Sequence, residues 1–353
     1  MGEVQEQQSY NALAIVFENN IRRLTALYEK AGSWEKAWRH LDPQLKTVER
    51  EKEWKKLEAH GVRLLLETDP SYPRLLREIP SFPLGLYVRG GEMHSDELCL
   101  AIVGTRKVSV SGRETARAFA AGLARAGVTV VSGLALGADA AAHAGALDAG
   151  GRTIAVLANG LHETYPRQHE ALGRQILERG GTLVSEYPVG MPPLPHRFIE
   201  RNRIISGLCR GAVIVEAPTG SGALATARFA FEQNREVFVV PGPVRHPNYE
   251  GSHKLIQDGA GLVTSVDDIL TALNIQKSPE EAFRAPRAGA SRASDENARL
   301  VLAALCAEGA LLDIDAIAEH TKLPIPEILR VVAELSVGGI IKESGGRYHA
   351  TQE

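Results

Sequence analysis

Cysteine is scarce in this sequence, and its scarcity narrows the classes of protein to which the chain can belong. The 353 residues include three cysteines, Cys99, Cys209 and Cys306, and no two of them have the C-x-x-C spacing of a zinc or redox site. We interpret them as small buried hydrophobic residues. The 11 histidines are not clustered as ligands, and no H-E-x-x-H occurs. The sequence therefore predicts no metal site and no bound cofactor.

Long apolar runs and a surplus of basic residues are also absent. No stretch reaches the ~20 consecutive apolar residues that span a bilayer, and the polar start Met1–Ser9 leads into no signal-peptide pattern. We therefore expect a soluble, cytoplasmic protein that does not contact a membrane. The net charge is −3, whereas domains that bind nucleic acid tend to be basic. Any anionic partner must be held by a local cluster of arginine and lysine.

The motifs of common catalytic sites are missing too. The sequence contains no G-x-x-x-x-G-K-[ST] loop and no G-x-S-x-G elbow. No close set of Asp and Glu follows a predicted strand in the way that a two-metal nuclease requires. The segments that follow the strands are instead rich in Arg, Gly, Ser and Thr, a chemistry that holds an anion. We predict that the protein is not an enzyme.

The pattern of apolar residues divides the chain into three modules and one linker. Residues 1–75 are predicted to form a small helical (SAM-like) module, although Val62–Leu66 is strand-like. Residues 76–275 alternate short apolar runs with Ala-rich segments of helical length. This pattern is typical of an α/β domain with a Rossmann-like parallel sheet covered on both faces. The segment 276–297 has the Pro, Gly, Ser and Arg content of a linker, and 298–353 is the third module.

Six apolar runs of the central block are the predicted strands: Cys99–Val103, Val128–Val131, Thr153–Leu157, Thr182–Val184, Ala212–Val215 and Val237–Val240. The third module reads as three helices followed by two short strands, which is a winged-helix pattern: Leu300–Cys306, Ile314–Glu319, Pro326–Val337, Ile340–Ser344 and Arg347–His349, with turns at Gly338-Gly339 and Gly345-Gly346.

Ligands of an open parallel sheet bind beyond the carboxyl ends of its strands, so the residues that follow each strand are the candidate site. The first strand is followed by Gly104, Thr105, Arg106 and Lys107. Here a glycine allows close approach of the backbone, and an arginine offers a planar fork that suits a phosphate. The alternative is a solvated arginine at a strand end.

Two glycine-rich loops open helices and are predicted anion sites, because free N–H groups point outward at such a turn. Their candidate residues are Ser132 and Gly133 in the first loop and Gly220, Ser221 and Gly222 in the second.

Asp139 and His143 lie four residues apart, hence on one face of a helix. They are either an acid–base pair or, more commonly, residues that cap and orient the start of the helix.

Further cations are expected at the same rim. Arg167 follows Tyr165-Pro166, and the tyrosine could stack on a base. Lys254 follows the sixth strand. The densest basic segment carries Arg197, Arg201, Asn202 and Arg203. Either these arginines contact phosphate, or buried carboxylates such as Glu216 hold them inside the fold, and we expect one of the three to be structural.

Taken in order, these motifs closely resemble those of the DNA-processing protein DprA (Smf) family. The resemblance rests on Ile102–Arg106, Ser132–Asp139 with Ala142-His143, Tyr165-Pro166, Arg201–Ile205 and Gly220–Gly222, and on the lead-in segments Tyr72-Pro73 and Leu86-Tyr87.

The resemblance implies that the protein binds single-stranded DNA during natural transformation, forms a homodimer and delivers the strand to the recombinase RecA. It also implies that Arg106 and Arg167 line the DNA pocket. The glycine loop of the family often reads GLARGID, and here Leu136 stands at the position of its arginine, so one positive charge is missing.

Two alternatives belong to other functional classes. Related Rossmann-like proteins hydrolyse the N-glycosidic bond of nucleotides with a glutamate in a PGGxGTxxE loop, but the matching loop here, Pro218–Thr226, carries no carboxylate. A transcription regulator could act through the winged helix. Its expected recognition helix, however, carries one basic residue, Arg330, against Glu327 and Glu334, and readout of a duplex needs several cations. That module could instead bind a protein.

Overall fold

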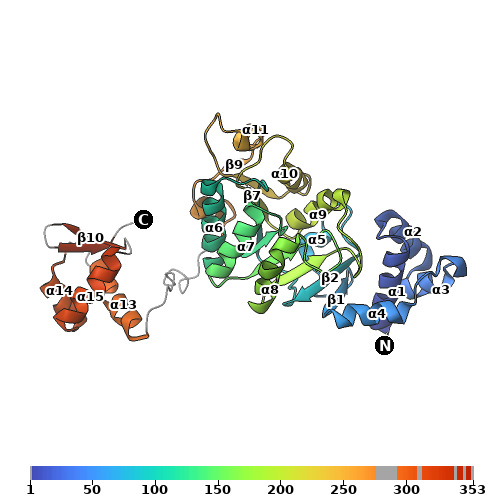
Figure 1. Ribbon diagram of the computed structural model, residues 1–353, viewed down its shortest axis with the longest axis horizontal. Coiled ribbons are helices and arrows are strands. Elements are labelled where there is room, and N and C mark those ends of the chain that lie inside the picture. The colour runs from blue at the N-terminus through green and yellow to red at the C-terminus, as the bar shows by residue number, and fades with distance from the viewer. Residues whose placement is uncertain (1, 276–291, 308–311, 338–339, 345–346, 351–353) are drawn as a thin grey trace. The chain divides into compact units, whose positions relative to one another are not determined.

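The computed structural model describes residues 2–275, 292–307, 312–337, 340–344 and 347–350 (Figure 1). The chain forms two compact units, Met1–Arg284 and Ala285–Glu353, which are described separately. Most of the predicted linker 276–297 and both predicted glycine turns of the third module lie outside the described residues.

The first unit begins with four helices: α1 (Gly2–Val16), α2 (Ile21–Ala31), α3 (Trp34–His40) and α4 (Arg50–Ala59), with a 3-10 turn, η1 (Pro43–Leu45). Polar caps define the starts of α2 and α3. The Asn20 side chain accepts a hydrogen bond from the backbone of α2, and Ser33 does the same for α3. The helices pack around Trp34, whose ring meets that of Tyr10 edge-on at 4.9 Å. Helices α1 and α4 lie beside β1 (Figure 1).

A nine-stranded sheet forms the centre of the unit. Its strands are β1 (Val62–Leu66), β2 (Gly85–Gly90), β3 (Cys99–Val103), β4 (Thr129–Ser132), β5 (Thr153–Val156), β6 (Thr182–Ser185), β7 (Gly211–Ile214), β8 (Glu236–Val239) and β9 (Gly261–Leu262). Their order is β1-β2-β6-β5-β4-β3-β7-β8-β9. The seven strands β3 to β9 are all parallel to one another. Strands β1 and β2 are antiparallel additions at one edge.

The mostly parallel α/β sheet is therefore as predicted. The strand at 62–66 belongs to this sheet, although the sequence places it in the helical module 1–75. The parallel part of the sheet starts in the middle at β3 and adds β4, β5 and β6 on one side. The chain then returns to the other side of β3, where it forms β7. This reversal creates a crevice beyond the carboxyl ends of β3 and β7, which is where such sheets bind ligands.

The helices of this part are α5 (Arg74–Arg77), α6 (Val110–Arg125), α7 (Ala138–Asp148), α8 (Glu170–Glu178), α9 (Pro195–Gly207), α10 (Gly222–Glu232), α11 (Glu250–Gln257) and α12 (Val266–Ala272), with short 3-10 turns η2 (Arg167–His169) and η3 (Pro247–Tyr249).

Alternation of side chains along β3 divides the core into two layers. Leu100 and Ile102 point to the face covered by α6, α7 and α12, and Ala101 and Val103 to the face covered by α9 and α10.

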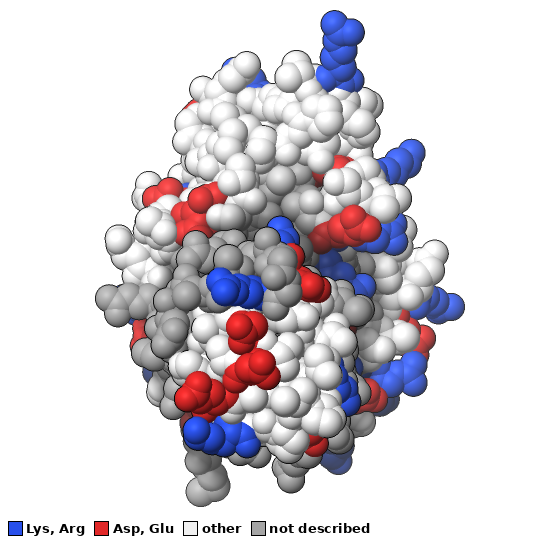
Figure 2. All heavy atoms as spheres, turned by 90° about the vertical axis from the view of Figure 1, so that its left-hand side faces the viewer, with Lys and Arg blue, Asp and Glu red and all other residues white. Residues whose placement is uncertain are grey.

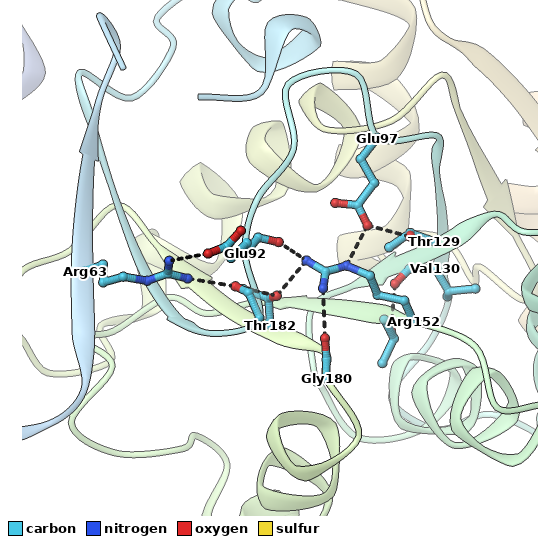
Figure 3. A network of polar contacts seen from close by, with 10 residues as sticks. Arg63, Glu92, Glu97, Thr129, Val130, Arg152, Gly180 and Thr182 are labelled. Atoms are coloured by element: carbon cyan, nitrogen blue, oxygen red, sulfur yellow. Dashed lines mark hydrogen bonds and ion pairs between the residues drawn. The ribbon is translucent and has the colours of Figure 1, made fainter. Parts of the chain in front are cut away.

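The amino ends of the strands are connected by one half-buried arginine, Arg152 (Figure 3). The Arg152 guanidinium donates to the Glu97 carboxylate at 2.6 Å, to the Gly180 carbonyl at 2.8 Å and to the Thr182 hydroxyl at 2.9 Å. Thr129 donates to the same Glu97 oxygen at 2.6 Å. Because these residues stand at or just before β3, β4, β5 and β6, the network fixes the end of the sheet opposite the crevice.

The second unit contains α13 (Arg292–Ala307), α14 (Ile314–Thr321), α15 (Ile325–Val337) and the antiparallel pair β10 (Ile341–Ser344) and β11 (Arg347–Ala350). Its core is built on Val301, Ile317, Ile328 and Val331. Helix α13 begins inside the predicted linker. In the described parts of the chain, no helix is both long and apolar enough to cross a membrane.

Candidate nucleic-acid interface

A cleft of about 590 Å³ opens beyond the carboxyl ends of β3 and β7. Eight residues predicted from the sequence line it: Gly104, Thr105, Arg106, Lys107, Arg201, Asn202, Ser221 and Gly222. The structure therefore brings together segments that are up to about a hundred residues apart in the sequence. Ser132, Gly133, Arg167, Arg197, Arg203, Gly220 and Lys254 are not among the lining residues.

The loop after β3 is held close to the loop after β7. The Thr105 amide donates to the Glu216 carbonyl at 2.7 Å, and the Thr105 hydroxyl accepts from the Lys107 amide at 3.2 Å. A Cβ at Gly104 would lie 2.7 Å from that of Ala138. Glycine is thus required there by packing against α7, and the exposed part of this loop is formed by Arg106 and Lys107.

A shelf of three adjoining side chains forms one wall of the cleft. The Arg106 guanidinium lies 5.5 Å from the centre of the Phe198 ring, and that ring lies 5.4 Å from the ring of Tyr165. Arg106 is exposed, and Tyr165 is 41% exposed. A cation and two aromatic faces therefore stand side by side on the surface of the cleft, which matches the alternation of phosphate and base along a single strand.

The first glycine loop does not offer its N–H groups to a ligand. The buried Asp139 carboxylate accepts from the Gly133 amide at 3.0 Å and from the Ala135 amide at 3.4 Å. Burial raises the pKa of Asp139, and the nearby Arg201 opposes that rise. The protein thus supplies its own anion to the turn predicted as an anion site. Ser132 points inward and donates to the Ile102 carbonyl at 2.7 Å.

His143 is not the acid–base partner of Asp139. Its Nδ1 lies 2.7 Å from the Thr153 hydroxyl, which itself donates to the Val130 carbonyl. Nδ1 must therefore carry the proton, which leaves Nε2 unprotonated and without a partner among the described residues. Burial, aided by His169 and Arg201, lowers the pKa of His143 to about 3, so the side chain is neutral. Of the two interpretations, Asp139 fits the one in which it orients the start of α7.

All three arginines of α9 are buried. Arg203 donates to the Glu186 carboxylate at 2.5 Å, and Arg201 donates to the Gly133 carbonyl at 2.8 Å and to the Val156 carbonyl. Arg197 donates to the Pro192 carbonyl at 2.7 Å. The sequence assigned a structural role to one of them, whereas the structure gives each a protein partner. Arg201 alone of the three also lines the cleft.

Glu216 does not hold an arginine, contrary to the alternative weighed from the sequence. Its carboxylate accepts from the Ser109 hydroxyl at 2.5 Å, from Asn248 at 2.6 Å and from the Tyr249 hydroxyl at 3.2 Å. Burial raises the pKa of Glu216, but these hydrogen bonds outweigh it and the net pKa is lowered. The residue joins the end of β7 to the start of α6 and to η3.

The second glycine loop is more open than the first. The Ser221 side chain caps α10 by accepting from the Ala223 amide at 3.3 Å. Nothing lies within 4 Å of a Cβ built on Gly220 or Gly222. Asn202 connects this loop to α9 by donating to the Gly222 carbonyl at 3.2 Å. The start of α10 therefore faces open space at the cleft, where its N-terminal N–H groups favour an anion.

The two remaining predicted cations lie outside the cleft. Arg167 is exposed in η2, two residues after Tyr165. Lys254 on α11 is exposed and lies 2.9 Å from the Asp258 carboxylate.

Sequence reasoning did not assign Phe198 or Ile199 to the site. Ile199 is 43% exposed at the cleft.

One face of the molecule shows a mixed distribution of charge. On the described part of the face drawn in Figure 2, Lys and Arg side chains are interspersed with Asp and Glu, and no broad area carries one sign. A phosphate backbone thus depends on local cations rather than on the field of the whole protein. Among the described residues no group of His, Cys, Asp and Glu is placed to hold a metal ion.

Comparison with known proteins gives consistent matches. Residues 63–274 match the family described as DNA recombination-mediator protein A. Protein Smf of Escherichia coli K12 is 40% identical over 320 residues, which cover 88% of this chain and 83% of that protein.

Two solved structures are also similar. DNA processing protein A of Streptococcus pneumoniae superposes with a TM-score of 0.59 and 34% identity, covering 76% of this chain and 95% of that one. The Helicobacter pylori protein, described with a single-stranded DNA binding mode, has a TM-score of 0.54 and 26% identity, covering 60% and 95%.

Proposed function

The chain belongs to the DNA recombination-mediator protein A family, also named DprA or Smf, and from this premise we propose that it binds single-stranded DNA in the cleft beyond β3 and β7. The observation that carries the proposal is the shelf of Arg106, Phe198 and Tyr165. The binding of single-stranded DNA by the similar Helicobacter pylori protein supports it.

The geometry suggests how each part of a strand would be held. Arg106 and Lys107 would contact phosphates, as would the N-terminal turn of α10 at Ser221 and Gly222. The faces of Phe198 and Tyr165 would receive bases. Stacking of this kind tolerates any base, and the faces of paired bases in a duplex are already stacked, so single strands are favoured over duplex.

Catalysis is not part of the proposal. Of the lining residues, all of which the structure describes, Asp139 is the single carboxylate, and it is buried against the backbone of its own loop. The position of the catalytic glutamate in the related nucleotide hydrolases is occupied by Thr226. We propose that the cleft holds its ligand without breaking a bond, and that none of its steps needs a metal or cofactor.

The family resemblance extends the proposal to the whole chain. We propose a cytoplasmic homodimer that protects incoming DNA in natural transformation and loads RecA onto it. The helical module at 1–75 would be SAM-like, and α13, α14, α15, β10 and β11 would form a winged helix. The exposed apolar side chains of α15, Ile325 and Leu329, suit a protein partner better than a duplex.

The test is a fluorescence titration of the full chain with labelled oligo-dT and with a duplex of equal length, at several salt concentrations. We expect tighter binding of the single strand, with a dissociation constant that rises with salt. Equal affinity for the two ligands, or no binding of either, would refute the proposal. In a second assay, the protein should shorten the lag of RecA's ATP hydrolysis on strands coated with single-strand-binding protein. An unchanged lag would remove the loading step alone.

A further inference from the structure

Helix α9 separates the first cleft from a second one. Phe198 and Ile199 face the first cleft, whereas His196, Arg197 and Arg203 line the second, which has a volume of about 770 Å³. The opposite wall of the second cleft is the turn between α1 and α2, residues 16–23. The helical N-terminal module thus completes a cavity on the far side of the helix that forms the first site.

Three buried polar side chains of this second cleft each have an atom without a partner among the described residues. These atoms are Arg203 Nη1, Glu186 Oε1 and Asn19 Oδ1. Arg203 is 9% exposed, Glu186 2% and Asn19 7%. A buried donor without a partner is unfavourable, so Arg203 Nη1 equips this cleft for an occupant that accepts a hydrogen bond, whereas the two oxygen atoms are acceptors and add nothing to that preference.

The rim of the cleft adds two exposed cations. Arg22 and Arg23 stand in the first turn of α2, and no ion pair is recorded for either side chain within the described parts of the chain. The N-terminus of α2 is fixed by Asn20, whose side chain accepts from the Arg23 amide at 3.1 Å. The first turn of a helix favours an anion, and the two arginine side chains add to that preference.

The balance of charge identifies the kind of occupant. Four arginines of the cleft face three glutamates, which leaves a net charge of one positive. Arg203 and Glu186 pair with each other, and the hydrogen bond from the Tyr187 hydroxyl to Glu200, at 2.9 Å, cancels no charge. The remaining positive charge favours an anion over a cation.

We propose that the second cleft holds the phosphates of the same DNA strand after it has crossed α9. The proposal rests on the proposed function of the first cleft. A helix with its side chains is about 10 Å across, which a strand spans with about three nucleotides at about 3.4 Å each. The exposed Ile199 and the half-buried Phe198 provide an apolar path over the helix between the two clefts.

The test compares two lengths of oligo-dT, about 4 and about 16 nucleotides, at the two ends of the usual range of site sizes. The variant is Arg22→Ala/Arg23→Ala in the full chain. We expect it to bind the long strand about 3- to 10-fold more weakly, with a salt slope smaller in magnitude by about 0.7 for each lost phosphate contact. It should bind the short strand as the wild type does, since that strand fills the first cleft alone.

Lys36→Ala/Arg39→Ala is the matched control, because it removes two exposed cations of the same module that do not line the cleft. Arg22→Lys/Arg23→Lys should retain most of the salt slope. Wild-type affinity of the double alanine variant for the long strand would overturn the proposal, as would an equal loss for both lengths or an equal loss in the control. If the wild-type protein binds neither strand, the proposed function itself fails, so the two failures are distinguishable.

Discussion

The shelf of Arg106, Phe198 and Tyr165 allows a quantitative prediction about two of its residues. Arg106→Ala removes a charged contact to phosphate, which is worth about 1.5–3 kcal/mol, so the dissociation constant for oligo-dT should rise about 10- to 100-fold. The magnitude of the salt slope should fall by about 0.7, since one counterion fewer is released from the strand. Phe198→Ala should cost about 1–3 kcal/mol through lost stacking, with an unchanged slope.

The two changes should also be coupled. The Arg106 guanidinium lies 5.5 Å from the centre of the Phe198 ring, and an exposed contact of this kind is worth about 0.5–1 kcal/mol. Without Phe198 the arginine loses the surface that orients it. The loss in the double variant should therefore be smaller than the sum of the two single losses, by about that amount.

The chain provides a matched control for this cycle. Arg228 lies 5.8 Å from the centre of the Phe229 ring on α10, exposed and outside the cleft. Arg228→Ala and Phe229→Ala remove the same kind of pair and should leave binding unchanged. The assay is fluorescence anisotropy of labelled oligo-dT over a range of salt. An unchanged salt slope in Arg106→Ala, or a loss of the same size in Arg228→Ala, would refute the assignment of Arg106 to phosphate.

Two further predictions concern stability. Burial lowers the pKa of His143 to about 3, against 6.5 for the free side chain. Between these two pH values the His143 side chain is protonated in the unfolded chain and neutral in the folded chain. The stabilisation is complete above pH 6.5 and should shrink by about 2 kcal/mol at pH 5 in urea unfolding. His143→Gln should flatten that profile, and the exposed His40→Gln should not. Arg203→Ala should cost about 3–5 kcal/mol because it leaves Glu186 buried without a partner, and adding Glu186→Gln should recover part of the loss. A loss below about 1 kcal/mol for Arg203→Ala would contradict this role.

The central sheet could be predicted from the sequence because its strands are short continuous apolar runs between helices. Each of the six predicted runs overlaps a strand of the sheet, with ends that agree to within one residue. Strands β2 and β9 were missed for different reasons. Strand β9 has two residues, too few to produce a pattern, and β2 follows a segment rich in proline. The antiparallel direction of β1 and β2 depends on which strand they meet, and that contact is not encoded in local periodicity.

The candidate site was predictable in outline but not in its internal bonding. The positions of the loops follow from the strand order, so Arg106 and Ser221 could be placed at one rim. The burial of α9 could not be foreseen, since helical spacing defines faces without saying which face is covered. The partner of Arg203 is Glu186, seventeen residues earlier on another element. The same holds for Asp139, whose carboxylate occupies the N–H groups of the loop that was predicted to bind an anion.

The burial of the α9 arginines has a consequence for affinity. With Arg197 and Arg203 bonded inside the protein, the exposed cations that line the first cleft are Arg106 and Lys107. Two phosphate contacts give a salt slope of only about −1.4, which is small for a nucleic-acid-binding protein.

Tight binding must then come from the number of sites engaged rather than from the charge of any one of them. On the proposals above, a strand long enough to reach the second cleft, or the cleft of a second protomer in the proposed homodimer, would gain affinity, because linked sites can raise it about 100-fold or more. A short fragment reaches one cleft and dissociates. The burial of the α9 arginines would thus make the protein selective for long single strands, which are the strands on which a recombinase filament can grow.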